Sequence, residues 1–268
     1  MKKIFFILTM SLLFAAACQK SGTGNEQPIN DNTSSIKYLV EKVANHNAVI
    51  VQPVNIDITA PVVVVVADDI TLATRAAETP QINFKAAEHC LIGRYTLCVI
   101  EAGNTTDVSY LNDVKSAFPN AKKHYLLSYR NGVAYTAAMQ MPSAFAAYGC
   151  VSGAIDVESY KVNSFTAPVS FVHVHAVNNP EFKWNGVLNK SVSVPLSIGA
   201  VVAINECTHY TTSEFTPREG KGRVKCTQYL GGATGTDVKL YTVESDNSGW
   251  CDEEFEVYNQ VWNFFKTR

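Results

Sequence analysis

The feature that most constrains this chain is a run of five valines, Val62 to Val66, directly after Pro61. β-Branched residues favour strands, and a strand that is apolar at every position has both of its faces covered. Five residues are too few to cross a membrane, the N-terminal apolar stretch is also too short, and no other apolar run reaches membrane-spanning length. The run therefore predicts the buried centre of a sheet with other elements packed on its faces.

The pattern around this strand changes near Tyr125. Before it, the spacing of apolar residues predicts helices over 35–46, 83–91 and 108–118 and strands over 48–54 and 95–100. After it, we expect strands over 125–129, 134–141, 147–155, 169–177, 197–204 and 239–243, and a terminal helix over 252–265. Asn131-Gly132, between two of these strands, predicts a hairpin turn. The fold class expected is α/β (α+β), with mixed sheets flanked by helices.

The N-terminal segment predicts export. Two lysines, the apolar stretch Ile4 to Phe14 and three alanines precede Cys18, as in a bacterial lipoprotein signal. We expect residues 1–17 to be removed, Cys18 to carry lipid, and 18–35 to form a flexible tether. Residues 36–268 would form one globular domain, anchored to a membrane of the cell envelope, most simply the outer membrane. The alternative is an ordinary signal peptide that is cut elsewhere.

Charge and cysteine content further narrow the classes of protein to which this chain could belong. The formal net charge of −2 argues against general electrostatic capture of nucleic acid. The chain has seven cysteines, so six remain after Cys18, and an even set in an exported protein predicts disulfides. The sequence cannot choose among the pairings, although proximity favours Cys90 with Cys98 and Cys207 with Cys226.

Acidic residues follow two of the predicted strands. Asp69 comes shortly after the valine run, and Glu101 follows the strand that ends at Ile100. Ligand sites in α/β sheets lie at the carboxyl ends of strands, and paired carboxylates are suitable Mg²⁺ ligands. Asp69 and Glu101 are therefore candidate metal ligands, and polar turns are the alternative explanation.

A pair of histidines, His173 and His175, falls within one predicted strand and on one of its faces. Such a pair can bind zinc or supply an acid, a base or a hydrogen-bond donor, but no third zinc ligand stands at a usual spacing. The sequence contains no Gly-x-Ser-x-Gly elbow of the kind that carries a nucleophilic serine.

Taken in chain order, these motifs resemble the endonuclease/exonuclease/phosphatase superfamily, which has the DNase I-like fold. The nearest pattern is that of the catalytic subunit of cytolethal distending toxins. The matching segments are 62–69, 97–103, 125–139, 171–176, 198–205 and 245–247, of which 125–139 would be a hairpin of central strands. The resemblance implies a DNase I-like sandwich, a phosphoester substrate and Mg²⁺ held by Glu101 and Asp69. It also implies that His175 contacts the phosphate, Asn205 orients it, and Asp246 supports a catalytic histidine.

The sequence departs from that family at positions that catalysis needs. Ala203 stands where the family has an aspartate, and Asn247 stands where it has the catalytic histidine. Each such group contributes roughly 10² to 10⁴ in rate. We therefore expect a divergent metal-dependent phosphodiesterase or a catalytically impaired descendant. The alternative is a non-enzymatic surface lipoprotein that binds a ligand or a protein partner.

Overall fold

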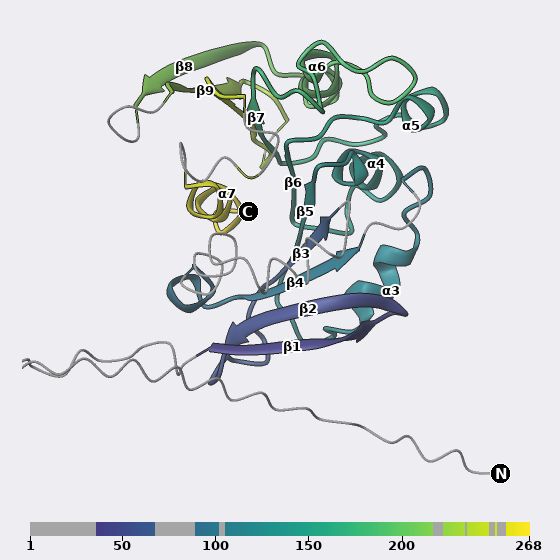
Figure 1. The fold of residues 1–268 in the computed structure, drawn as a ribbon, viewed down its shortest axis with the longest axis vertical. Coiled ribbons are helices and arrows are strands. Elements are labelled where there is room, and N and C mark those ends of the chain that lie inside the picture. The colour runs from purple at the N-terminus through teal and green to yellow at the C-terminus, as the bar shows by residue number, and fades with distance from the viewer. Residues whose placement is uncertain are drawn as a thin grey trace, which may run out of the picture. The chain divides into compact units, whose positions relative to one another are not determined.

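A single sheet of ten strands organises the described part of the chain (Figure 1). The computed structural model describes residues 36–67, 89–101, 105–216, 222–233, 235–246, 250 and 256–268. The strand order is β1-β2-β4-β3-β5-β6-β7-β10-β9-β8. The strands are β1 (Ile36–Val43), β2 (His46–Pro53), β3 (Val62–Ala67), β4 (Thr96–Glu101), β5 (His124–Tyr129), β6 (Ala147–Val151), β7 (Phe171–Ala176), β8 (His209–Phe215), β9 (Val224–Leu230) and β10 (Val238–Val243).

The six strands from β4 to β10 in this order are parallel, and an antiparallel hairpin closes each end of the sheet. Parallel neighbours require crossover connections, which the helices supply. The helices are α3 (Tyr110–Ser116), α4 (Val133–Gln140), α5 (Val157–Val162), α6 (Val194–Ile204) and α7 (Val257–Phe265). A further helical turn covers 89–93.

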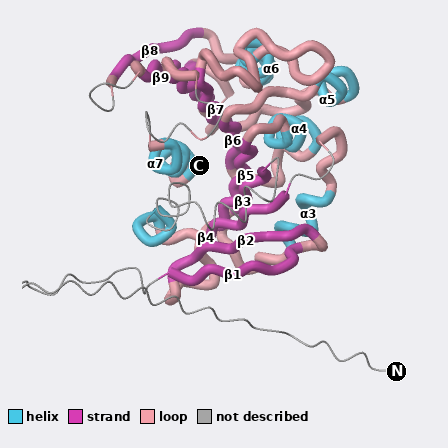
Figure 2. Tube along the Cα trace, in the orientation of Figure 1, coloured by secondary structure: helices cyan, strands magenta, loops and turns pink. Residues whose placement is uncertain are grey.

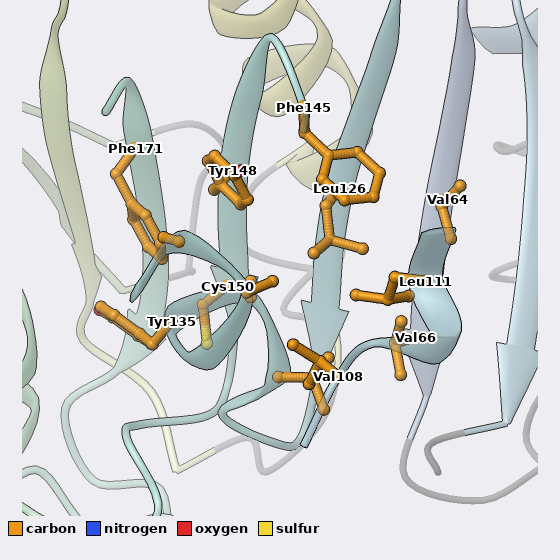
Figure 3. Close-up of a cluster of buried hydrophobic side chains, with 14 of the residues drawn as sticks. Val64, Val66, Val108, Leu111, Leu126, Tyr135, Phe145, Tyr148, Cys150 and Phe171 are labelled. Carbon is orange, nitrogen blue, oxygen red and sulfur yellow. The ribbon is translucent and has the colours of Figure 1, made fainter. Parts of the chain in front are cut away.

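Helices cover both faces of the sheet (Figure 2). Buried side chains of α3, α4 and α6 form one core with the sheet, and those of α7 form a second core on the opposite face. Alternate valines of β3 point into each core, so Val64 and Val66 lie in the first and Val63 and Val65 in the second. Figure 3 shows the first core, with Tyr135 of α4 against β7. The predicted buried strand is confirmed, because all of β3 is buried.

The predicted helix over 35–46 is wrong, because this segment forms β1 and the turn into β2. Ala44 and Asn45 both have positive φ angles, of 50° and 68°. Two central residues with positive φ form the hairpin turn that matches strand twist. Eight residue pairs with β2 then outweigh the helical spacing of the apolar residues.

Two predicted strands are helices. The segment 134–141 belongs to α4, and 197–204 belongs to α6. Residues Val133 to Met139 are all buried, so α4 has no polar stripe by which its period could be recognised. Ser193 caps α6, because its side chain accepts a hydrogen bond from the Leu196 N–H. Asn131-Gly132 therefore joins a strand to a helix and is not a hairpin turn.

The cysteines that the structure describes are free thiols: Cys90, Cys98, Cys150, Cys207 and Cys226. The predicted pairs Cys90–Cys98 and Cys207–Cys226 are therefore wrong. Burial raises the pKa of the Cys98 thiol to about 12, and it is wholly buried in the first core. Within the residues that are described, no helix is both long and apolar enough to cross a membrane.

Candidate functional site

The carboxyl ends of the parallel strands line up at one edge of the sheet. The register places Glu101, Ala67, Tyr129, Val151 and Val174 at one level across β4, β3, β5, β6 and β7. Ligands of open parallel sheets bind in the crevice outside this edge. The loops that follow these strands are therefore where a site is expected.

The connection from β5 to α4 is a sharp elbow at this edge. It consists of three residues, Arg130, Asn131 and Gly132, between the end of β5 and the start of α4. Arg130 forms its apex and has a φ angle of 58°, a left-handed conformation that is unfavourable for a residue with a Cβ atom. The Arg130 N–H donates to the Val151 carbonyl at 3.0 Å, which ties the apex to the end of β6.

Two glycines allow the elbow to pack closely against the chain that follows β6. A Cβ atom on Gly132 would lie 2.3 Å from the Ala154 carbonyl oxygen. A Cβ atom on Gly153 would lie 2.1 Å from the Asn131 carbonyl oxygen. Both contacts are far shorter than van der Waals separation, so any larger residue would force the two segments apart.

Asn131 fastens the elbow to the sheet and to the helix. Its Nδ2 donates to the carbonyl oxygens of Val66 at 3.1 Å and Tyr129 at 3.0 Å. Its Oδ1 accepts from the Val133 N–H at 3.1 Å, at the first turn of α4. The buried Ser128 hydroxyl donates to the Asn131 carbonyl at 3.2 Å. These contacts fix the backbone on which the Arg130 side chain is mounted.

The Arg130 guanidinium forms an ion pair with Glu181, which lies on the loop that follows β7. The two side chains retain 22% and 38% of their exposure, so the pair is accessible from solvent. Arginine is always charged in proteins and presents planar donors that match a carboxylate. The apex of the elbow is thus a fixed cation with a carboxylate against it.

The backbone around Glu181 is held by the buried Asn179. The Asn179 Oδ1 accepts hydrogen bonds from the Glu181 N–H at 3.0 Å and the Phe182 N–H at 2.9 Å. On the other side, His175 Nε2 donates to the Phe182 carbonyl at 2.7 Å. The loop is therefore anchored on both sides of the residue that faces Arg130.

His175 belongs to a buried chain of hydrogen bonds, and the donor and acceptor of each bond can be assigned from its end at Phe182. Because the Phe182 carbonyl can only accept, His175 carries its proton on Nε2 and accepts on Nδ1 from His173 Nε2 at 3.3 Å. His173 Nδ1 then accepts from the Tyr135 hydroxyl at 2.6 Å. Burial lowers the pKa of His175 to about 4 and that of His173 well below its usual range. Both imidazoles are therefore neutral at pH 7.

The candidate residues that the structure describes, His175, Asn205, Glu101 and Asp246, do not meet in one cleft. Asn205 is buried and clamps Val169, which precedes β7, with hydrogen bonds of 2.7 and 2.9 Å. It lies at the amino end of β7, whereas His175 lies near the carboxyl end, roughly 20 Å along the strand. His175 itself is committed to the buried chain and contacts no open space.

Two of the acidic candidates, Glu101 and Asp246, are also apart. Glu101 ends β4 and is partly exposed, and Asp246 follows β10 and is exposed. Five strand spacings separate β4 from β10, roughly 24 Å. Asp69 and Cys18 lie outside the described residues, as do Asn247 and Cys251. In the part of the chain that is described, no three His, Cys, Asp or Glu side chains are grouped so that they could hold a metal ion.

An apolar groove lies on the helical layer. It has a volume of about 570 Å³ and runs between α4, α5 and α6, lined by Met139, Ile155, Tyr160, Phe165 and Ala203 among others. This volume falls within the range of small-molecule sites. The lining contains neither an acid nor a basic side chain, so the elbow remains the better candidate for polar chemistry.

Comparison with known proteins shows a likeness of fold only. No protein-family profile matches the chain, and no curated protein resembles it in sequence. An acetyl xylan esterase from Aspergillus awamori superposes with a TM-score of 0.51 at 11% identity, over 84% of this chain and 99% of that protein. A candidate dipeptidyl aminopeptidase IV from Bacteroides ovatus gives a TM-score of 0.50 at 12% identity, over 87% of this chain and 36% of that protein. These structures have the α/β-hydrolase fold.

The resemblance to DNase I-like enzymes is thereby wrong. The described part of the chain forms one mixed sheet with a parallel centre and helices on both faces, and not a sandwich of sheets. The segments 134–141 and 198–205, which that resemblance treated as strands, are helical. The phosphodiesterase function and the roles of His175, Asn205 and Asp246 rested on it. Glu101 and Asp69 were expected to bind Mg²⁺ both from that resemblance and from their places after two strands. Those strands, β4 and β3, are parallel neighbours, but Asp69 lies outside the described residues, so this pair stays a prediction.

Sequence reasoning also missed Arg130 and Glu181. The search was for Gly-x-Ser-x-Gly, which is absent, and Asn131-Gly132 was interpreted as a hairpin. A small residue, an apex and a glycine at the same spacing are present as Ser128-Tyr129-Arg130-Asn131-Gly132. This spacing was the local signal for the elbow, because the buried helix α4 that follows does not reveal its period in the sequence.

Proposed function

We propose that this protein is a non-hydrolytic counterpart of α/β-hydrolase-fold enzymes, in which the crevice at the carboxyl edge binds a ligand without cleaving it. One observation carries the proposal: the apex of the elbow between β5 and α4 is Arg130. In α/β hydrolases the nucleophilic serine occupies the apex of the corresponding strand-to-helix turn, with small residues two positions before and after it. Here those flanking positions are Ser128 and Gly132.

Arginine cannot replace serine in this chemistry. Its guanidinium keeps its proton under all ordinary conditions and has no lone pair to offer a carbonyl carbon. Attack on an ester or amide requires an activated hydroxyl or thiol with a base within hydrogen-bond reach. A cation paired with Glu181 provides neither part, whereas it is well suited to hold an anionic group.

The remaining partner of a catalytic triad is also missing. In α/β hydrolases the triad residues follow in the order serine, acid and histidine. The acid would belong to the loop after β7, yet the only histidine beyond that loop is His209. His209 is exposed at the start of β8, five strands from β5 and roughly 24 Å away across the sheet. No rotation of its side chain can bridge that distance.

The cellular compartment in which this binding takes place is also a proposal. Export and lipid attachment at Cys18 are predicted from the first residues of the chain, which lie outside the described part. If both occur, the ligand is one that the cell envelope presents.

An assay of hydrolysis tests the proposal directly. The purified full chain is incubated with p-nitrophenyl acetate and, separately, with a fluorophosphonate probe that labels activated serines. We expect acetate release at the rate given by the heat-denatured protein and no covalent labelling. Arg130→Ser restores a serine but no histidine, so it is expected to stay inactive. Turnover by the wild-type protein, or stoichiometric labelling of any serine, would overturn the proposal.

A further inference from the structure

We propose that Arg130 is the anchor for a carboxylate-bearing ligand, which takes the place of the Glu181 carboxylate. This inference rests on the proposed function and names the class of ligand that the same crevice binds. It draws on three features of the site: the rigid mounting of Arg130, the carboxylate already seated against it, and the ease with which that carboxylate can leave.

The mounting of Arg130 is independent of its own side chain. The elbow is held by hydrogen bonds of Ser128 and Asn131 and by the close approach of Gly132 and Gly153 to neighbouring carbonyl groups. These contacts involve the backbone and side chains of other residues, and they hold Arg130 at the carboxyl edge, where parallel sheets bind ligands.

Glu181 shows which chemical group the site accepts. Its carboxylate comes from a separate loop, 51 residues along the chain, and lies against the Arg130 guanidinium. A planar guanidinium is the preferred partner of carboxylates, because its fork of donors matches two oxygen atoms. A free carboxylate of a ligand can make the same contact.

Exchange requires only a side-chain rotation. Asn179 and His175 hold the backbone around Glu181, so the loop keeps its place when the pair opens. The Glu181 side chain is 38% exposed and has room to turn into solvent. Ion pairs that are open to water stabilise proteins by about fivefold in equilibrium constant at most. A ligand that adds contacts elsewhere in the crevice can therefore displace it.

The opposing explanation is a structural latch, in which the pair only holds the loop after β7 against the elbow. The two explanations differ in what removal of Glu181 does. If the pair is only a latch, removal of the Glu181 carboxylate lowers the stability of the protein and does not raise its affinity for carboxylates. If Arg130 is an anchor, the same change removes an internal competitor, and the protein binds external carboxylates more tightly.

The experiment titrates the full chain with benzoate, followed by ligand-observed NMR, and uses benzamide as the neutral control of the same shape. Glu181→Gln should tighten benzoate binding about threefold to fivefold, because the tethered competitor is gone. Arg130→Gln should abolish the binding. Arg223→Gln is the matched control, since Arg223 forms a comparable ion pair with Glu244 on the β9–β10 hairpin, and it should change nothing. Benzamide should not bind any of the four proteins.

Benzoate binding that survives Arg130→Gln overturns the inference, and so does a Glu181→Gln variant that binds no more tightly than the wild type. If Arg130→Gln does not fold, as thermal unfolding would reveal, the Glu181→Gln comparison decides alone. Ester turnover in the hydrolysis assay defeats the proposed function itself. Absence of both turnover and benzoate binding defeats only the carboxylate anchor.

Discussion

The buried histidine chain makes the protein sensitive to mild acid, and the size of this effect follows from the structure. Both imidazoles are fully buried, and burial lowers the pKa of His175 to about 4. An unfolded histidine has a pKa of about 6.5. Between these values the unfolded chain binds a proton that the folded chain excludes. The contribution of the neutral His175 to stability is therefore fully present above the unfolded pKa, and it is lost as the pH falls through this window.

For His175 alone, linkage predicts a loss of about 2 kcal/mol in the free energy of unfolding between pH 7 and about pH 5. His173, whose pKa burial also lowers well below the usual value, adds to the loss in the same direction. The loss from His175 alone is a large fraction of the stability of an ordinary domain. Protonation of His175 at Nδ1 would break the hydrogen bond that it accepts from His173 Nε2, whereas its Nε2–H would still donate to the Phe182 carbonyl.

Urea unfolding of the wild-type protein and of His175→Gln at the two pH values checks this. Glutamine can donate to the Phe182 carbonyl and accept from His173, but it does not titrate. We expect the acid-induced loss to shrink by about 2 kcal/mol in this variant. His209→Gln, at an exposed position of β8, is the control and should leave the loss unchanged. Equal acid-induced losses in the free energy of unfolding for the wild type and His175→Gln would refute the conclusion that the buried His175 is neutral in the folded protein.

Two further predictions concern the elbow and the N-terminus. Gly153→Ala should destabilise the protein by about 2 kcal/mol, since the added Cβ would meet the Asn131 carbonyl oxygen at 2.1 Å. Gly199→Ala, within α6 and with nothing inside 4 Å, should instead gain up to about 1 kcal/mol. Equal urea midpoints for the two variants would contradict the packing of the elbow. Cys18→Ala should move the expressed protein from the membrane pellet to the soluble fraction, and pelleting like the wild type would refute lipid attachment there.

The buried strands were predictable because their signal is local. The valines of β3 and the apolar residues of β4 and β5 appear in the sequence as short continuous runs, which is what a strand covered on both faces requires. α7 was predictable because it is amphipathic, with Val261 and Phe265 facing the core and Lys266 just beyond its end.

The segments that were misassigned have a common physical cause. α4 is apolar on every side, and an apolar run without a polar face fits a strand and a buried helix equally well. At β1 the reverse holds, because a helical spacing of apolar residues was overruled by pairing along the whole length of β2. In both places the deciding interaction is with a distant part of the chain. Local propensity is too weak to resist it.

The sequence by itself determined the buried strands, the terminal helix and a prediction of export. Only the tertiary structure decided which strands are neighbours, because parallel pairing joins segments separated by whole crossovers. That order brings β5 and β7 to within two strands of each other and places Arg130 against Glu181, 51 residues away. It also leaves Glu101, Asn205 and Asp246 at separate places on the sheet. The candidate site thus results from the strand order, which the local pattern of residues does not reveal.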